Sequence, residues 1–102
     1  MKNVPPAQKL LMRNRQVRVW EMVLRPGQGY PMHHHQYPYL SIMLESTTVV
    51  MTDPKGRKER LKVQKGDVVW RVPPDDHSVQ NIGRGMFRNR LVEVRGSCAM
   101  RE

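Results

Sequence analysis

The sequence lacks several features, and each absence excludes a class of protein. Cys98 is the only cysteine among 102 residues. This excludes an intrachain disulfide and a metal site built from cysteines, and it fits a reducing compartment. No apolar run approaches the roughly 18 residues of a membrane span, and residues 1–6 lack the apolar core of a signal peptide. We therefore expect a soluble, cytoplasmic protein without a membrane partner.

Acidic residues are also scarce, because 9 Asp and Glu face 18 Lys and Arg, for a net charge of +9. Such an excess can bind phosphates without sequence preference. Six of the basic residues crowd into one predicted hairpin: Lys55, Arg57, Lys58, Arg60, Lys62 and Lys65. There Arg60 and Lys62 alternate with Leu61 and Val63, as on the solvent side of a half-buried strand. The pattern favours a solvated strand face over nucleic-acid binding, with a contact surface for an anion or an acidic partner as the alternative.

No segment shows a convincing helical pattern, whereas strand patterns recur about every ten residues. We expect strands at residues 17–24, 39–45, 47–52, 57–63, 68–72 and 87–94. The third and fourth of these flank a turn with Pro54 second and Gly56 last, the order that a type I turn favours, so they predict a hairpin. Short strands separated by glycine and proline predict an all-β sandwich or barrel in a single domain.

The chain divides into three expected parts. Residues 1–16 are basic, contain Pro5 and Pro6 and carry an apolar patch at 10–12. They form either a loose N-terminal arm or an edge strand that pairs with a neighbouring subunit. Residues 17–95 form the barrel, and residues 96–102 form a C-terminal tail.

The most distinctive stretch contains His33, His34 and His35, with His77 beside its own proline-rich turn. On an extended strand, side chains alternate between faces, so His33 and His35 point to one side and His34 points to the other. Two imidazoles at this spacing can share one metal ion, and hairpin folding can bring His77 alongside them. Three neutral imidazoles would make a site for a first-row transition metal.

Two groups of residues around these histidines resemble the two sequence motifs of the cupins. The matching positions are Gly27, His33 and His35, then Gly66, Asp67, Pro73, His77 and Asn81. The resemblance runs from about residue 17 to residue 94 and is close to the small single-domain cupins, some of which are linked to β-alanine breakdown. It implies an antiparallel jelly-roll barrel of about six to eight strands. It also implies a homodimer with one divalent metal inside the mouth of each barrel.

The sequence departs from the cupin pattern at two places. Tyr39 stands where many cupins have a glutamate ligand, and Asp75 and Asp76 follow Pro73 where a glycine is common, with one residue fewer than usual before His77. A phenol next to a cation could lose its proton and act as a ligand or an acid-base group. Alternatively, Tyr39 only packs and forms hydrogen bonds. We consider Tyr39 as the candidate catalytic residue.

The resemblance also implies a function. His33, His35 and His77 would hold Fe(II), Mn(II), Zn(II) or Ni(II) and leave open positions for a small anionic organic substrate. Three-histidine cupins include iron-dependent dioxygenases that act on thiols and diketones, so a dioxygenase is the first expectation and an isomerase or decarboxylase the second. The alternative is a non-catalytic cupin that binds or senses a small ligand.

Other residues have expected structural roles. Asn81 should form hydrogen bonds that close a loop. Four aromatic residues are expected in the core or at the mouth of the barrel: Tyr30, Tyr37, Trp70 and Phe87. Three arginines are expected on the outer face, with binding of a substrate carboxylate as the alternative if they face inward: Arg71, Arg88 and Arg90.

Overall fold

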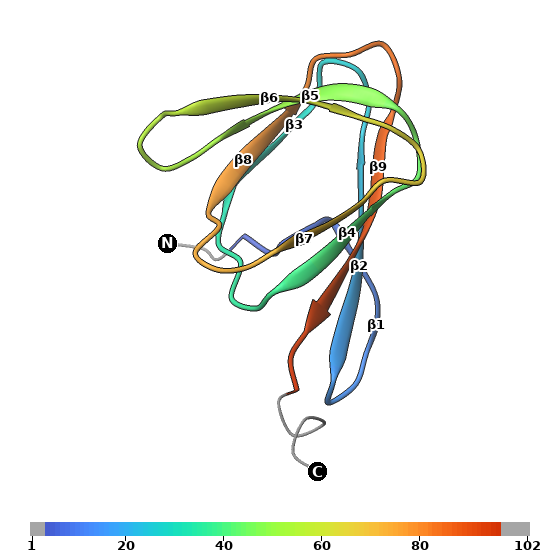
Figure 1. Ribbon diagram of the computed structural model, residues 1–102, viewed down its shortest axis with the longest axis vertical. Helices are drawn as coiled ribbons and strands as arrows, with labels where there is room; N and C mark the ends of the chain where they lie inside the picture. The colour runs from blue at the N-terminus through green and yellow to red at the C-terminus, as the bar shows by residue number, and fades with distance from the viewer. Residues whose placement is uncertain (1–3, 97–102) are drawn as a thin grey trace.

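The computed structural model describes residues 4–96, which form nine β-strands in two antiparallel sheets and no helix (Figure 1). The strands are β1 (Lys9–Arg13), β2 (Val17–Leu24), β3 (Gly29–His33), β4 (Tyr39–Met43), β5 (Thr47–Thr52), β6 (Lys58–Val63), β7 (Val68–Arg71), β8 (His77–Asn81) and β9 (Phe87–Val94). One sheet has the order β1-β2-β9-β4-β7 and the other the order β3-β8-β5-β6. Among these residues, no helix could span a membrane. The expected all-β jelly-roll fold is confirmed.

Alternating side chains explain how the two sheets pack. In β4, in β9 and in β2 from Trp20 onward, every second residue is buried, and the residues between them are half-buried. A strand presents successive side chains to opposite faces, so each of these strands directs one set toward the other sheet. The buried hydrophobic residues are Ala7, Trp20, Met22, Leu24, Tyr39, Met43, Val49, Val63, Val79, Phe87 and Leu91. Figure 1 shows the two sheets facing each other.

A glycine turn places β7 beside β4. Gly66 has a φ of 94°, in the left-handed region that favours glycine. Its amide donates to the carbonyl of Met43 at the end of β4, and the Met43 amide donates to the carbonyl of Asp67. This turn starts β7 in the register that sets Arg71 opposite Tyr39. The Gly66-Asp67 turn therefore sets Arg71 opposite Tyr39, close to the histidines.

Asn81 closes a loop, as expected. Its side chain is fully buried. The Nδ2 group donates to the carbonyls of Leu24 (2.9 Å) and Gly85 (2.8 Å). The Oδ1 atom accepts from the hydroxyl of Thr47 and the amide of Gly83. One amide side chain thus joins the end of β2, the start of β5 and the loop before β9.

Two expectations about strands and surfaces need correction. The extended strand through His33 and His35 is wrong, because β3 ends at His33 after an irregular register, and His35 lies in the loop before β4. Trp70 is not in the core or at the mouth: it is 54% exposed. The reason is that β7 is an edge strand and Trp70 lies opposite Leu40, on the outer face of the sheet.

Strand β6 of the basic hairpin has the burial pattern that the sequence predicts. Arg60 and Lys62 are exposed, whereas Val63 is buried. The strand β1 pairs with β2 of the same chain. The expected C-terminal tail lies outside the described residues except for Gly96.

Candidate metal centre

Three histidines from separate parts of the chain meet at one end of the barrel. His33 ends β3 and His77 begins β8, and the two are direct cross-strand partners. His35 comes from the loop after β3. All three are buried, and one ring nitrogen from each lies within 4.8 Å of the others. The structure therefore brings together the three residues that the sequence pattern singles out.

The two histidines from the β3 segment are held in the neutral form. Burial lowers the pKa of His33 to about 4 and the pKa of His35 to about 3, from 6.5. Metal ions bind the neutral ring, so these groups need not lose a proton at neutral pH. His33 Nδ1 lies 2.8 Å from the carbonyl oxygen of Pro31. Donation to that carbonyl leaves Nε2 of His33 available as a ligand atom.

His35 carries the observation that fits a metal best. Both of its ring nitrogens are buried and have no hydrogen-bond partner among the described residues. A buried polar group without a partner costs about 1 to 3 kcal/mol. Coordination of an ion by His35 together with His33 and His77 would give one nitrogen a partner. This donor set, three imidazoles, fits a divalent first-row metal.

Asp75 connects the histidines to two other side chains. Its carboxylate accepts hydrogen bonds from Arg71 at 2.8 and 2.9 Å and from the hydroxyl of Tyr39, and it lies 3.3 Å from His77 Nδ1. Burial alone would raise the pKa of Asp75, but the hydrogen bonds from His77, Arg71 and Tyr39 outweigh it and lower the pKa. Asp75 thus stays ionised and orients the ring of His77. This role of Asp75 is not predictable from local sequence, because it depends on the register between β7 and β4.

Tyr39 packs directly against the cluster. Its ring stacks on His35 with centroids 4.3 Å apart and an angle of 20° between the planes. Burial, and then the hydrogen bond to Asp75, raise the pKa of the Tyr39 phenol above its ordinary value. The phenol is therefore a protonated donor in this arrangement.

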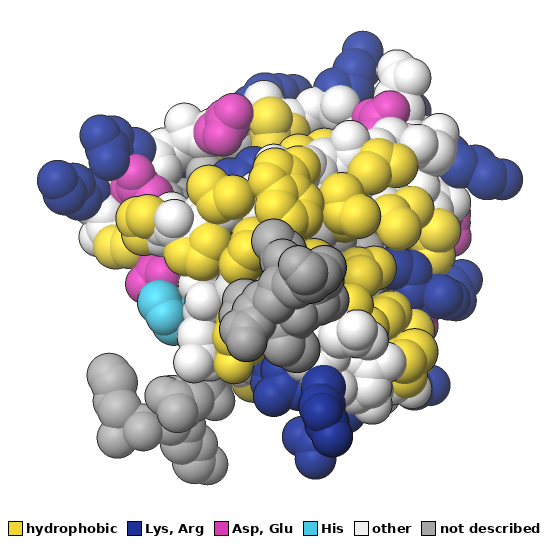
Figure 2. Space-filling model, turned by 60° about the horizontal axis from the view of Figure 1, so that its bottom comes forward, with side chains coloured by type: hydrophobic (Ala, Val, Ile, Leu, Met, Phe, Trp, Pro, Cys, Tyr) yellow, Lys and Arg dark blue, Asp and Glu magenta, His cyan; other side chains and the backbone are white. Residues whose placement is uncertain are grey.

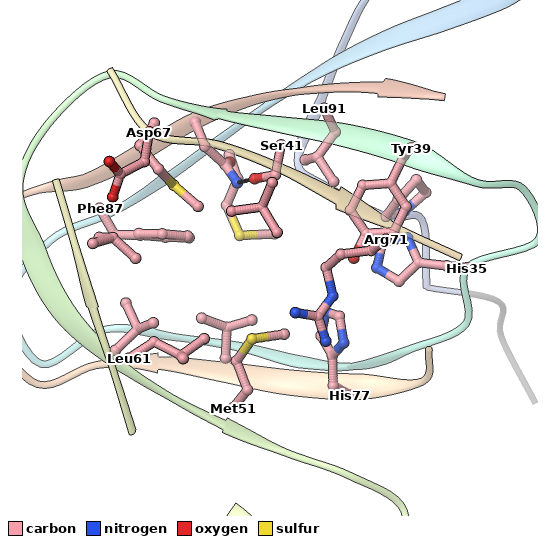
Figure 3. A pocket seen from close by; sticks show the side chains of 18 of the residues that line it. His35, Tyr39, Ser41, Met51, Leu61, Asp67, Arg71, His77, Phe87 and Leu91 are labelled. Carbon is pink, nitrogen blue, oxygen red and sulfur yellow. Dashed lines mark hydrogen bonds between the residues drawn. The ribbon is translucent and has the colours of Figure 1, made fainter. Parts of the chain in front are cut away.

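A pocket of about 340 Å³ opens from the histidines into the space between the sheets. Figure 3 shows His35, Tyr39, Arg71 and His77 at one end and Phe87 toward the other. The outer-face expectation is wrong for Arg71, whose side chain lines this pocket and pairs with Asp75. It is right for Arg88 and Arg90, which pair with Glu21 at the surface.

The segment before β1 covers part of the same end of the barrel. Pro6 lines the pocket, and the hydroxyl of Tyr30 donates to the carbonyl of Pro5 at 2.9 Å. The side-chain amide of Gln8 exchanges two hydrogen bonds with the backbone of Val23. Hydrogen bonds to Tyr30 and Val23 therefore hold this segment against the barrel.

His34 takes no part in the cluster. Its side chain is 66% exposed, and its Nδ1 lies 2.8 Å from a carboxylate oxygen of Asp76. The outward direction expected for His34 is confirmed, and the residue offers a matched control for its buried neighbours.

No protein-family model and no curated protein matches the chain. A cupin domain protein from Bordetella pertussis is 21% identical, over 94% of this chain and 99% of that one, with a TM-score of 0.81. An RmlC-like cupin family protein from Methanocaldococcus jannaschii is 17% identical, over 92% and 84%, with a TM-score of 0.71. The chain has the cupin fold.

The cupin fold of this chain also matches part of a larger enzyme. Oxalate decarboxylase from Bacillus subtilis is 27% identical over 81% of this chain but only 22% of that one, with a TM-score of 0.62. The cupin structures from Bordetella pertussis and Methanocaldococcus jannaschii confirm the resemblance to small single-domain cupins at the level of the fold. The link to β-alanine breakdown stays a prediction.

Proposed function

We propose that this cupin holds one divalent metal through His33, His35 and His77 and binds a small organic anion beside it. The observation that carries the proposal is the set of three buried imidazoles that face one another, with both nitrogens of His35 unpartnered among the described residues. The adjoining pocket gives a ligand room next to the open side of such a centre.

The neighbouring residues would prepare the site for chemistry. A bound Fe(II), Mn(II), Zn(II) or Ni(II) would supply Lewis acidity or redox chemistry and open positions for ligands. Arg71 presents its guanidinium to the pocket and is held by Asp75, so it can attract a carboxylate. Hydrophobic side chains along the pocket exclude water from the anion.

For the reaction, we propose dioxygenase-type chemistry first and decarboxylation second, with isomerisation as a further possibility. Dioxygenase-type chemistry is supported by the ligand set: all three proposed ligands are histidines and none is a carboxylate, as in the three-histidine cupins that this sequence resembles. The similarity to oxalate decarboxylase supports the second. A non-catalytic cupin that binds or senses a small ligand is the alternative function. We further propose a cytoplasmic location, which the single cysteine supports.

The test uses chelator-treated protein reloaded separately with each of the four metals. Small carboxylic acids, thiols and diketones are then screened for metal-dependent thermal stabilisation, oxygen uptake and release of carbon dioxide. We expect stabilisation by at least one class of anion, and only when metal is present. Binding without turnover would select the non-catalytic alternative. If no anion binds with any metal, the proposed function is wrong.

The Asp75→Asn substitution is expected to lower metal affinity about 10-fold to 100-fold, because Asp75 orients His77 and residues that orient metal ligands contribute at this scale. Competition with a fluorescent zinc chelator measures the affinity. The matched control is Asp76→Asn, since Asp76 contacts the exposed His34 instead. Equal affinities in both variants would show that Asp75 does not support the site.

The Tyr39→Phe substitution keeps the stacked ring and removes the hydroxyl that donates to Asp75. We propose that Tyr39 acts as an acid-base group in the reaction, so turnover with the best substrate should fall at least about tenfold, which corresponds to about 1.4 kcal/mol. Metal content should stay the same. Turnover within about twofold of the wild type would leave the hydroxyl without a catalytic role.

We also propose that two copies of the chain associate through the outer face of the five-stranded sheet. The register places five apolar residues in one row across all five strands: Met12, Val19, Val92, Leu40 and Trp70. Figure 2 shows hydrophobic side chains gathered on one face, with lysine and arginine around its border. Glu21 beside the row is already paired with Arg88 and Arg90, so a second copy can cover the face without stranding these charges.

The Trp70→Lys substitution is expected to convert a dimer of twice 12.0 kDa into a monomer, because it places a charge on each side of the two-fold contact. Sedimentation equilibrium measures the mass. The control is Ile82→Lys, a similarly exposed residue outside the row, which should leave the dimer intact. A monomeric wild type would refute the proposed association.

A further inference from the structure

We propose that Ser41 and Asn89 form a second polar contact inside the pocket that binds a hydroxyl group at the far end of the anion. The inference rests on the proposed function, in which the anion's charged end lies at the histidines. It adds the class of ligand: a short-chain carboxylic acid that carries a hydroxyl at the opposite end.

The pair is buried and its hydrogen bonding is incomplete. Asn89 and Ser41 are 5% and 4% exposed, and both line the pocket. Asn89 Nδ2 donates to the hydroxyl oxygen of Ser41 at 2.8 Å. Asn89 Oδ1 has no hydrogen-bond partner among the described residues. Buried polar groups are nearly always satisfied, so an acceptor that lacks a partner beside a pocket points to a group that the pocket receives.

Strand β4 places Ser41 one inward position beyond Tyr39, whose ring stacks on His35. Tyr39 and Ser41 are successive inward residues of β4, so their Cα atoms lie about 7 Å apart along the strand. Figure 3 shows Ser41 pointing into the pocket between the end formed by His35 and Tyr39 and the end formed by Phe87. A carboxylate held at the histidines could therefore reach Ser41 and Asn89 through a chain of about four to eight carbons.

The walls between the two polar sites determine the rest of the ligand. They are formed by apolar side chains, among them Met22, Met43, Val49 and Leu91. Methylene groups fit such walls, whereas a polar group in the middle of the chain would be buried without a partner. A terminal hydroxyl can donate to Asn89 Oδ1 and accept from the hydroxyl of Ser41. It would also match the pair if the Asn89 amide were turned over, because it donates and accepts equally well.

Zinc-loaded protein and matched pairs of probes test the inference. The probes are straight-chain carboxylates of about four to eight carbons and the same acids with a terminal hydroxyl, titrated by calorimetry. We expect the hydroxy acid of the best-fitting length to bind at least about tenfold more tightly than its plain counterpart, since a site built around a hydroxyl discriminates against analogues that lack it.

Substitutions then assign the preference to the pair. In Asn89→Leu the plain acid should bind more tightly than the hydroxy acid. If this variant fails to fold, Ser41→Ala takes its place, and it should reduce the preference for the hydroxy acid. The control Met51→Leu changes an apolar wall residue and should keep the preference. Equal binding of the two acids, binding of neither, or an unchanged preference in Asn89→Leu and Ser41→Ala would overturn the inference.

Elemental analysis of the same samples separates this failure from failure of the proposed function. Protein that holds zinc but ignores the hydroxyl refutes only the second polar contact. Protein that holds no zinc refutes the metal centre and, with it, the anion position from which the ligand class is inferred.

Discussion

The His35→Leu substitution is expected to stabilise the metal-free protein by about 1 kcal/mol and to remove its response to divalent metal. Two buried ring nitrogens without partners cost free energy, and leucine removes them. Loss of the stacking on Tyr39, about 0.5 to 1.5 kcal/mol, offsets part of the gain. His35 is expected to destabilise the metal-free protein, and it lies beside two other histidines. Coordination of a metal explains both observations.

Chemical denaturation with chelator and with added zinc measures both effects. The wild type should gain stability with zinc, and His35→Leu should not. The control is His34→Leu, which changes the exposed neighbour and should keep the zinc response. If His35→Leu is strongly destabilised in chelator while both proteins ignore zinc, His35 is a structural core residue.

The metal-free protein is also expected to lose stability as the pH falls below about 6.5. Burial lowers the pKa values of His33 and His35 to about 4 and about 3, whereas both titrate near 6.5 in the unfolded chain. Between these values the unfolded chain binds more protons than the folded one, so stability decreases with decreasing pH. Each histidine contributes a slope of up to about 1.4 kcal/mol per pH unit. The loss should continue until the pH reaches the folded-state values.

Denaturation at a series of pH values in chelator measures this slope. His35→Leu should reduce it by about half, because one of the two histidines with a lowered pKa is removed, and His34→Leu should leave it unchanged. A wild-type stability that is flat between pH 6.5 and about 4.5 would mean that the buried rings are already protonated in the folded protein, which is incompatible with a ready metal site.

Much of the fold is predictable from local patterns. The predicted bounds of β2, β5 and β9 match the structure, because alternating or β-branched runs bounded by turn residues mark a strand. The two cupin-like motifs also predict which histidines come together. They do so because the turn at Gly27 and Gln28 forms backbone hydrogen bonds with Asn81 at the end of β8, which sets β3 beside β8.

The remaining features depend on register between distant strands, which local patterns do not contain. Arg71 faces the pocket because β7 pairs with β4 in one register, and Asp75 then reaches both Tyr39 and His77. The exposed position of Trp70 follows from the same register. An aromatic residue in an apolar run is predicted to be buried unless its strand is known to lie at the edge of a sheet.

The most direct test of the metal centre is elemental analysis of protein purified without chelator and without nickel affinity resin. The wild type and His34→Ala should contain close to one first-row metal ion per chain, and His33→Ala and His77→Ala should contain almost none. A metal content that is negligible in the wild type, or that persists in both ligand variants, would contradict coordination by the three histidines.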